Sequence, residues 1–202
     1  LVCYFISIPS AFTQRSEIGI TLGTMYYLGD INPTKHFSNT QPAGGLIYRL
    51  NLNSRITLRF NGIYGHITAS DAETKENTQR NLSFKSSIKE IAGIVEINYV
   101  SFMPGSTSQN KITSYVFFGI NGVFFNPKAM FQNNWYELQP LNTEGQKKSY
   151  KKFAPAIPFG IGVKANISNN ITFSLEWGLR KTFTDYLDDV SGTYAGRDAF
   201  PL

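Results

Sequence analysis

The stretch "IPFGIGVKANISNNITFSLEWGLR", residues 157–180, decides the fold class. Apolar side chains occupy every second position on both sides of the short segment "SNN" (168–170), and mostly glycine or polar residues stand between them. Alternation with a period of two is typical of a β-strand that has one apolar face. The stretch therefore predicts two antiparallel strands joined by a tight turn.

The same period runs through most of the chain, and no segment shows the 3.6-residue period of an amphipathic helix. Five further segments alternate in this way: "EIGITLGTMYY" (17–27), "GLIYRL" (45–50), "ITLRFNGIYG" (56–65), "EIAGIVEINY" (90–99) and "YVFFGINGVF" (115–124). Together these segments predict seven strands and an all-β fold.

The connections between the strands alternate in length. Three are short, "NLNS" (51–54), "MPGSTSQN" (103–110) and "SNN", whereas those around residues 28–42, 66–87 and 126–155 are much longer. Short turns at one end and long loops at the other are typical of bacterial outer-membrane barrels. The pattern favours a closed up-and-down antiparallel transmembrane β-barrel.

The composition is consistent with a single domain that carries little charge. Of 202 residues, 42% are apolar, 14% aromatic and only 16% charged, whereas soluble domains have about 25% charged residues. No window reaches the run of about 20 apolar residues that a transmembrane helix needs. The net charge of +5 is spread over scattered lysines and arginines, so we expect no nucleic-acid partner. A single cysteine, Cys3, rules out an internal disulfide and a thiolate metal site.

The residues on the two faces of the strands distinguish a soluble barrel from a membrane barrel, which alternation alone cannot do. A soluble barrel points its apolar face inward, whereas a membrane barrel points it at lipid and encloses the polar face. The polar face collects seven glycines, as a narrow lumen needs, and its four acidic and four basic residues balance, as a low-dielectric interior requires. We therefore expect a membrane barrel whose lumen holds eight charges: Glu17, Arg49, Arg59, Glu90, Glu96, Lys164, Glu176 and Arg180.

Closed single-chain barrels of bacteria have even strand counts, and eight strands leave a lumen that side chains fill. Since seven strands are visible, we expect an eighth beyond Leu202, so that residues 15–202 form a C-terminally truncated outer-membrane barrel domain. Residues 1–14, "LVCYFISIPSAFTQ", are interpreted as the remnant of a secretory signal peptide. The alternative for this segment is a buried first strand.

The lumen charges and the rim have functional and structural interpretations. The charges could relay protons or substrate, or they could form a salt-bridged plug, which their equal numbers favour. The stretch "RKTFTDYLDDVSGTY" (180–194) places Asp185, Asp188 and Asp189 together, but without the spacing of a calcium-binding loop. Ser191, Asp189 and His66 form the one trio that a small lipid-modifying enzyme could use. We expect no catalytic, cofactor-binding or metal-binding residue and interpret Thr184, Asp185, Tyr186, Asp188 and Asp189 as a hydrated rim loop.

Several polar segments resemble the PorG family, small outer-membrane barrels of the type IX secretion machinery in Bacteroidota. The segments that carry the resemblance span residues 16–194 and include "SEIGITLGTMYYLGDIN", "AGGLIYRLNLNSRITLRFNGIYGHITASD", "RNLSFKSSIKEIAGIVEINY", "LNTEGQ", "PFGIGVK" and "LRKTFTDYLDDVSGTY". The resemblance implies a non-enzymatic integral protein of the outer membrane, in contact with its lipid. It implies that the protein anchors a periplasmic ring, made of a PorK-like lipoprotein and a PorN-like protein, in a system that supports gliding motility in some relatives.

The predicted topology places the three short turns on the periplasmic side, where such a ring would lie. Their candidate partner residues are Asn51, Asn53, Ser54, Pro104, Gly105, Ser168 and Asn169. The alternatives are a small lipid-modifying enzyme of the outer membrane, a passive small barrel and a soluble lipid-binding barrel.

Overall fold

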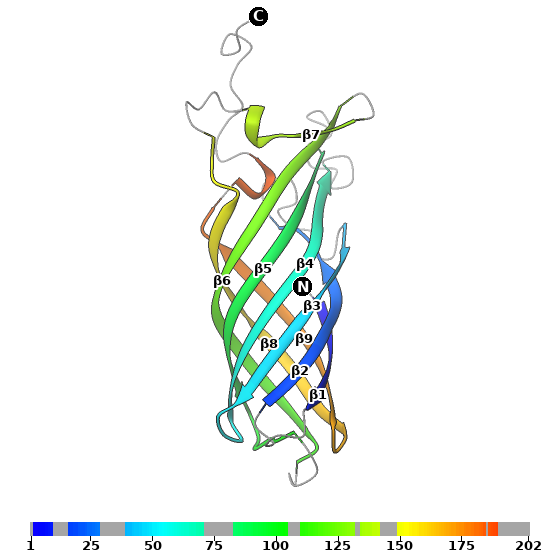
Figure 1. Cartoon of the computed structure of the whole chain (residues 1–202), viewed down its shortest axis with the longest axis vertical. Coiled ribbons are helices and arrows are strands. Elements are labelled where there is room, and N and C mark those ends of the chain that lie inside the picture. The colour runs from blue at the N-terminus through cyan, green and yellow to red at the C-terminus, as the bar shows by residue number, and fades with distance from the viewer. Residues whose placement is uncertain are drawn as a thin grey trace, which may run out of the picture.

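The computed structural model describes residues 2–9, 16–28, 39–70, 83–104, 110–131, 134–141, 149–184 and 186–189. These residues form nine strands and two short 3-10 helices (Figure 1), and the strands are β1 (Val2–Pro9), β2 (Ser16–Met25), β3 (Gln41–Asn51), β4 (Ile56–Ser70), β5 (Ser83–Asn98), β6 (Ile112–Phe131), β7 (Asn134–Glu137), β8 (Phe153–Ser168) and β9 (Ile171–Thr182). The helices are η1 (Gln139–Leu141) and η2 (Tyr186–Asp188).

Eight of these strands close into one ring. The pairing runs β1-β2-β3-β4-β5-β6-β8-β9, and β9 pairs again with β1. Every neighbouring pair is antiparallel. Strand β7 pairs with the end of β6 and extends beyond the ring (Figure 1). The structure thus confirms an all-β, closed, up-and-down antiparallel barrel of eight strands.

The position of the eighth strand differs from the expectation. Strand β1 fills the place between β2 and β9 that we assigned to a segment beyond Leu202. Its sequence, "VCYFISIP", is rich in β-branched and aromatic residues, which favour strands. The alternative interpretation of this segment as a first strand is therefore the one that the structure adopts, and cleavage of residues 1–14 stays a prediction.

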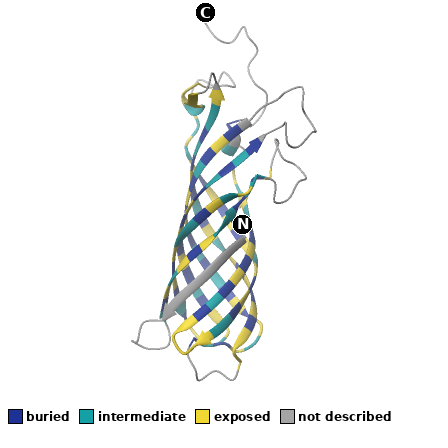
Figure 2. Cartoon of the chain, turned by 90° about the vertical axis from the view of Figure 1, so that its right-hand side faces the viewer, coloured by how far each residue is buried: buried dark blue, intermediate teal, exposed yellow. Residues whose placement is uncertain are grey.

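The apolar face of the wall points outward, as the glycines and the balanced charges of the polar face predicted. Ile120 on β6 and Ile161 on β8 are 75% and 58% exposed, and exposed apolar residues recur along every strand from β2 to β9. In Figure 2 exposed and buried residues alternate along the strands. Soluble monomers rarely expose contiguous apolar patches above a few hundred Å². The outward apolar face of the described strands is therefore unusual for a soluble monomer.

Glycines on the inward face make room for large rings in the lumen. A Cβ atom on Gly162 would lie 2.5 Å from Cζ of Tyr115, and one on Gly178 would lie 2.5 Å from Cζ of Phe117. Such distances do not occur between real Cβ atoms and neighbouring atoms. The small residues therefore admit the long ones, which is the role that the sequence suggested for them.

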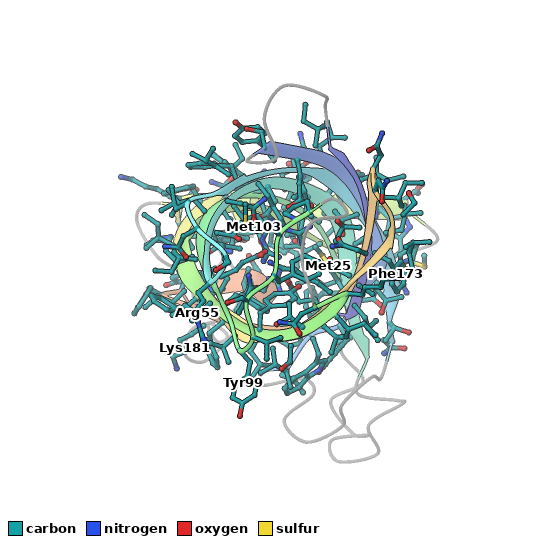
Figure 3. All side chains as sticks on the ribbon, turned by 90° about the horizontal axis from the view of Figure 1, so that it is seen from below. Met25, Arg55, Tyr99, Met103, Phe173 and Lys181 are labelled. Atoms are coloured by element: carbon teal, nitrogen blue, oxygen red, sulfur yellow. The ribbon has the colours of Figure 1, made fainter. Side chains whose placement is uncertain are left out.

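The barrel end with the short connections is closed by its own chain. The segment after β5 folds back under the strands, where Phe102 is 2% exposed and its N–H donates to the carbonyl of Ser54 at 2.8 Å. The Asn166 amide donates to the Met103 carbonyl at 2.9 Å. Seen from this end, Met103 lies across the ring, and Tyr99 projects outside it (Figure 3). Among the described residues, no helix is long and apolar enough to cross a membrane.

Candidate functional site

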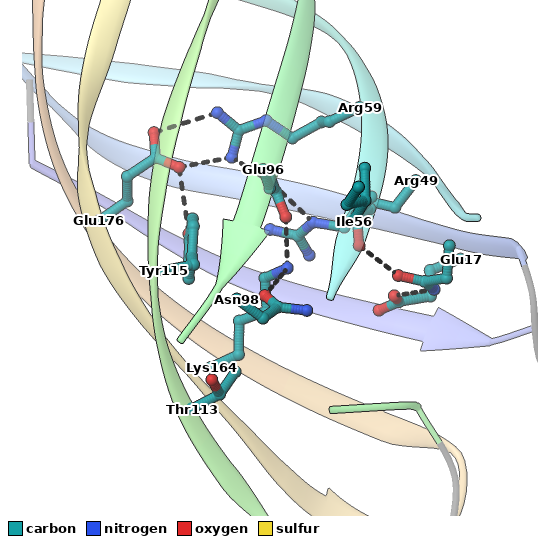
Figure 4. Close-up of polar contacts among 12 residues, drawn as sticks. Glu17, Arg49, Ile56, Arg59, Glu96, Asn98, Thr113, Tyr115, Lys164 and Glu176 are labelled. Atoms are coloured by element: carbon teal, nitrogen blue, oxygen red, sulfur yellow. Dashed lines mark hydrogen bonds and ion pairs between the residues drawn. The ribbon is translucent and has the colours of Figure 1, made fainter. Parts of the chain in front are cut away.

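The most concentrated chemistry in the molecule is a buried layer of charges inside the barrel. Glu96 on β5 stands at its centre and accepts contacts from three cations on three other strands (Figure 4). Arg49 Nε lies 3.2 Å and Arg59 Nη1 2.8 Å from Glu96 Oε1, and Lys164 Nζ contacts Oε2. All four side chains are at most 2% exposed.

Arg59 extends this layer across the lumen. Its guanidinium contacts both Glu96 and Glu176, with Nη2 3.3 Å from Oε1 of Glu176. The Tyr115 hydroxyl donates to Oε2 of the same carboxylate at 3.1 Å (Figure 4). A buried ion pair is tolerated when further hydrogen bonds satisfy the charged groups. Glu176 meets this condition through one guanidinium and one hydroxyl.

Two aromatic rings support the cations of this layer. The Arg59 guanidinium carbon lies 5.0 Å from the centre of the Phe117 ring, and Lys164 Nζ lies 4.5 Å from the centre of the Tyr115 ring. A cation over an aromatic face is attracted by the ring quadrupole, by about 2 kcal/mol when it is desolvated. Lys164 Nζ also donates to Asn98 Oδ1 at 3.2 Å. Rings and amides thus hold the cations in place around the carboxylates.

The lower edge of the layer is a chain of hydrogen bonds that contains Asn51. Its amide donates to Glu17 Oε1 at 2.8 Å, and its carbonyl oxygen accepts from the Thr57 hydroxyl at 2.6 Å. Asn51 is 3% exposed. It therefore belongs to the lumen network and is not available as a partner residue.

A second ion pair and an apolar chamber lie toward the end with the long loops. Arg180 Nε is 3.2 Å from Glu90 Oε2. The pair lines a cavity of about 160 Å³ whose other lining is mostly apolar, including Met25, Ile67 and Ile88. An enclosed apolar cavity of about this size can hold a benzene-sized molecule. A small cavity lined mainly by apolar side chains therefore lies beside the Arg180–Glu90 pair, toward the end with the long loops.

The structure places the eight predicted lumen charges inside the barrel. Glu17, Arg49, Arg59, Glu90, Glu96, Lys164 and Glu176 are buried, and Arg180 is partly buried. Five of them, Arg49, Arg59, Glu96, Lys164 and Glu176, form one continuous network, and Glu90 and Arg180 form a separate pair. The carboxylates of Glu96 and Glu176 each form direct ion pairs with the cations of the network. This arrangement is a salt-bridged plug.

The short turns contain fewer accessible residues than expected. Ser168 and Asn169 are exposed, as is Asn53, but Pro104 is buried like Asn51. Asn53 has a local role, because its Oδ1 accepts from the N–H of Arg55 and of Ile56. Ser54 is partly buried, and Gly105 lies outside the described residues. The expectation of an accessible Asn51 and Pro104 was wrong, because both pack into the closed end.

The rim loop is anchored inside the barrel mouth instead of lying in water. Asp189 is fully buried and accepts from the Tyr150 hydroxyl at 2.5 Å. The Tyr150 ring stacks on Tyr186 with centres 4.6 Å apart. The expectation of a hydrated Asp189 was wrong, because a tyrosine from a distant loop satisfies it. Thr184 Oγ1 accepts from the Tyr186 N–H, whereas Asp185 and the side chain of Asp188 lie outside the described residues.

The hypothetical catalytic trio is not brought together by the described residues. His66 stands on the outer wall, with Nε2 3.3 Å from the Tyr64 hydroxyl, whereas Asp189 is buried under the rim loop. Ser191 lies outside the described residues. Within the described part of the chain, no group of three or more His, Cys, Asp or Glu side chains could hold a metal ion.

Sequence reasoning did not assign several residues to these networks, among them Tyr115, Asn98 and Tyr150. Tyr115 and Asn98 occupy inward positions of their strands, so the alternation could have found them. Tyr150 lies in a long loop that has no period. Its partnership with Asp189 arises only from the tertiary fold.

These features define a small eight-stranded β-barrel with an apolar outer wall and an ionic plug. The chain matches the profile of DUF6089, a domain of unknown function, over residues 1–199, and it belongs to this family. Neither the curated proteins nor the solved structures gave a match.

Proposed function

We propose that this barrel is an integral protein of the bacterial outer membrane and a non-enzymatic component of the type IX secretion machinery. The observation that carries the membrane location is the outward apolar wall, with residues such as Ile120 and Ile161 more than half exposed. Closed barrels can span a bilayer because every strand edge is paired. The resemblance to PorG-like proteins supplies the secretion role.

The filled lumen supports a scaffold in preference to a channel. Arg59, Glu96 and Glu176 cross the interior, and the segment around Phe102 covers one end. A lumen of eight strands is just wide enough for side chains to fill it. The barrel therefore acts as a rigid anchor that offers turns and loops to partners on each side of the membrane.

The periplasmic partner is a ring built from a PorK-like lipoprotein and a PorN-like protein, which this barrel ties to the outer membrane. Ser168 and Asn169 are the most accessible of the proposed contact residues, because they form the tip of the β8–β9 hairpin without a lumen role. Contacts at this tip would hold the ring against the inner surface of the membrane.

The test is affinity purification of the tagged barrel from gently solubilised outer membranes. The wild-type protein is expected to recover both ring proteins. A variant with Ser168→Glu and Asn169→Glu should lose most of them, whereas Lys181→Glu, which changes the charge equally on the opposite rim, should retain them. Recovery of the barrel alone from cells that make the ring would refute the secretion role. Equal recovery by both variants would refute the contact at this turn.

A further inference from the structure

We propose that the outer wall of the barrel carries a binding site for the phosphate group of a lipid headgroup, on strands β4, β5 and β6 near the long loops. The proposal deepens the membrane location proposed above and rests on it for the source of the ligand. The site is a surface cavity of about 360 Å³, lined by Tyr64, His66, Lys85, Ser87, Asn126, Lys128 and Trp135. Ligand sites usually have volumes of about 300–1,000 Å³.

The site carries an excess of positive charge, which lysines on adjacent strands contribute. Lys85 on β5 stands directly opposite Lys128 on β6, and Lys89 follows on the same face of β5. Like charges directly opposite each other destabilise a sheet. A bound anion between the two ammonium groups would remove this cost.

Nearby carboxylates leave part of this charge uncompensated. Glu137 on β7 lies 3.3 Å from Lys128 Nζ and 2.8 Å from Lys152 Nζ. Within the described part of the chain, neither Lys85 nor Lys89 forms an ion pair with a carboxylate. Of the four lysines in this region, Lys128 and Lys152 therefore share one carboxylate, and Lys85 and Lys89 remain available to an anion.

The polar and aromatic side chains that line the cavity are suited to binding a phosphate group attached to a sugar. Ser87, directly opposite Asn126, adds a hydroxyl donor between the lysines, whereas the Asn126 amide already donates to Glu137 Oε1 at 2.8 Å. Phosphate oxygens accept strong hydrogen bonds from ammonium and hydroxyl donors. Tyr64 and Trp135, 49% and 47% exposed, flank the cavity and offer apolar rings with a polar edge.

The height of the site on the wall matches the headgroup level of a bilayer. From Lys89 to Tyr99, which is 78% exposed, the chain advances ten residues through outward Ile91 and Ile97. At about 3.3 Å per residue and a tilt of about 40°, this distance spans about 25 Å along the barrel axis. The apolar band of an outer-membrane barrel is about 25 Å tall. Lys89 therefore stands at the edge of the apolar band, and Lys85 and Lys128, four residues farther along the strands, stand about 10 Å beyond it on the headgroup side.

The test is a binding measurement on the purified full chain in detergent micelles, with lipid A as the probe. Native mass spectrometry would compare lipid A that carries its phosphates with lipid A treated with a phosphatase. Inorganic phosphate is the competitor that separates a headgroup from a free anion. Each lysine near a charged membrane surface contributes about fivefold in binding. Lys85→Gln with Lys89→Gln should therefore weaken binding about 25-fold, and Lys181→Gln, an exposed lysine on β9, should change it less than twofold.

The result that would overturn the proposal is equal binding of lipid A by the double variant and by Lys181→Gln, or equal binding of the dephosphorylated lipid. If inorganic phosphate binds at this site and lipid A does not, the proposal that the phosphate belongs to a lipid headgroup would be overturned. Lys85→Gln should keep or raise the stability of the barrel, because it relieves the pairing with Lys128. A loss of binding without a loss of stability therefore identifies a site. Insertion of the protein into lipid vesicles, measured in parallel, tests the proposed membrane location independently of lipid A binding.

Discussion

Removal of Arg59 is the perturbation that probes the ionic plug most directly. The Arg59→Ala change takes the cationic partner away from Glu176 and one of three cations away from Glu96. Breaking a buried ion pair by removing one member costs about 3–5 kcal/mol, because the other charge stays buried without its partner. Loss of the contact with the Phe117 ring adds to this cost. We therefore expect the free energy of unfolding to fall by at least about 3 kcal/mol.

The assay is urea unfolding of the barrel in lipid vesicles, followed by the mobility difference of folded and unfolded protein in unheated gels. Arg55→Ala is the matched control, because the side chain of this exposed arginine makes, among the described residues, a single surface hydrogen bond to the Tyr99 carbonyl at 3.0 Å. The control should lose less than about 1 kcal/mol. Arg59→Met combined with Glu176→Gln removes both charges and should be more stable than Arg59→Ala alone. Equal costs for Arg59→Ala and Arg55→Ala would refute a plug held by buried ion pairs.

Three further changes test other parts of the structure. Gly162→Val should prevent folding or lower stability by several kcal/mol, since its side chain would overlap the Tyr115 ring; refolding yield measures this. Tyr150→Phe should cost about 1–3 kcal/mol, because the buried Asp189 loses its hydroxyl donor, and hydrogen exchange in the rim loop should rise. Hydrogen bonds from Lys152, Asn126 and Lys128 lower the pKa of Glu137 to about 2. Strand β7 should therefore keep its protection from hydrogen exchange above pH 4.5 and lose it as the pH falls toward 2. The Glu137→Gln variant should show no such transition.

Each of these changes has a result that would contradict it. Gly44→Ala is the control for the glycine change, because its Cβ would meet only atoms at ordinary distances of 3.5 Å. Equal refolding of the two glycine variants would contradict a close-packed lumen. Unchanged exchange in the Tyr150→Phe variant would contradict the anchoring of the rim loop. For Glu137, a transition that survives in the Gln variant would assign the pH dependence to another group.

Most strands of the barrel wall could be predicted, because the alternation that marks them depends only on residues close together in the sequence. A strand that separates two environments must alternate, and the glycines and balanced charges on one face indicated that Glu176 faces the lumen whereas Leu175 and Trp177 face outward. The same rule placed the eight charges. Strand β1 was harder, because "VCYFISIP" is an almost continuous apolar run that a signal peptide also shows.

The rest depends on contacts between distant parts of the chain. Asp189 looked like a hydrated loop residue, and its burial depends on Tyr150, which lies 39 positions earlier. The role of Asn51 became visible only when Glu17 and Thr57 were beside it. Loop residues have no period that reports their environment. Their partners therefore appear only in the folded structure.

The central claim is that the apolar wall faces lipid, and the most direct test is the environment of single labels on the barrel in vesicles. Cys3 is first replaced by serine, and an environment-sensitive fluorophore is attached to Ile161→Cys, Ile91→Cys or Asn169→Cys. The account predicts blue-shifted emission and quenching by lipid-borne quenchers at the two wall positions, and emission typical of water at the turn. Water-like emission at Ile161 and Ile91 in a folded barrel would contradict it.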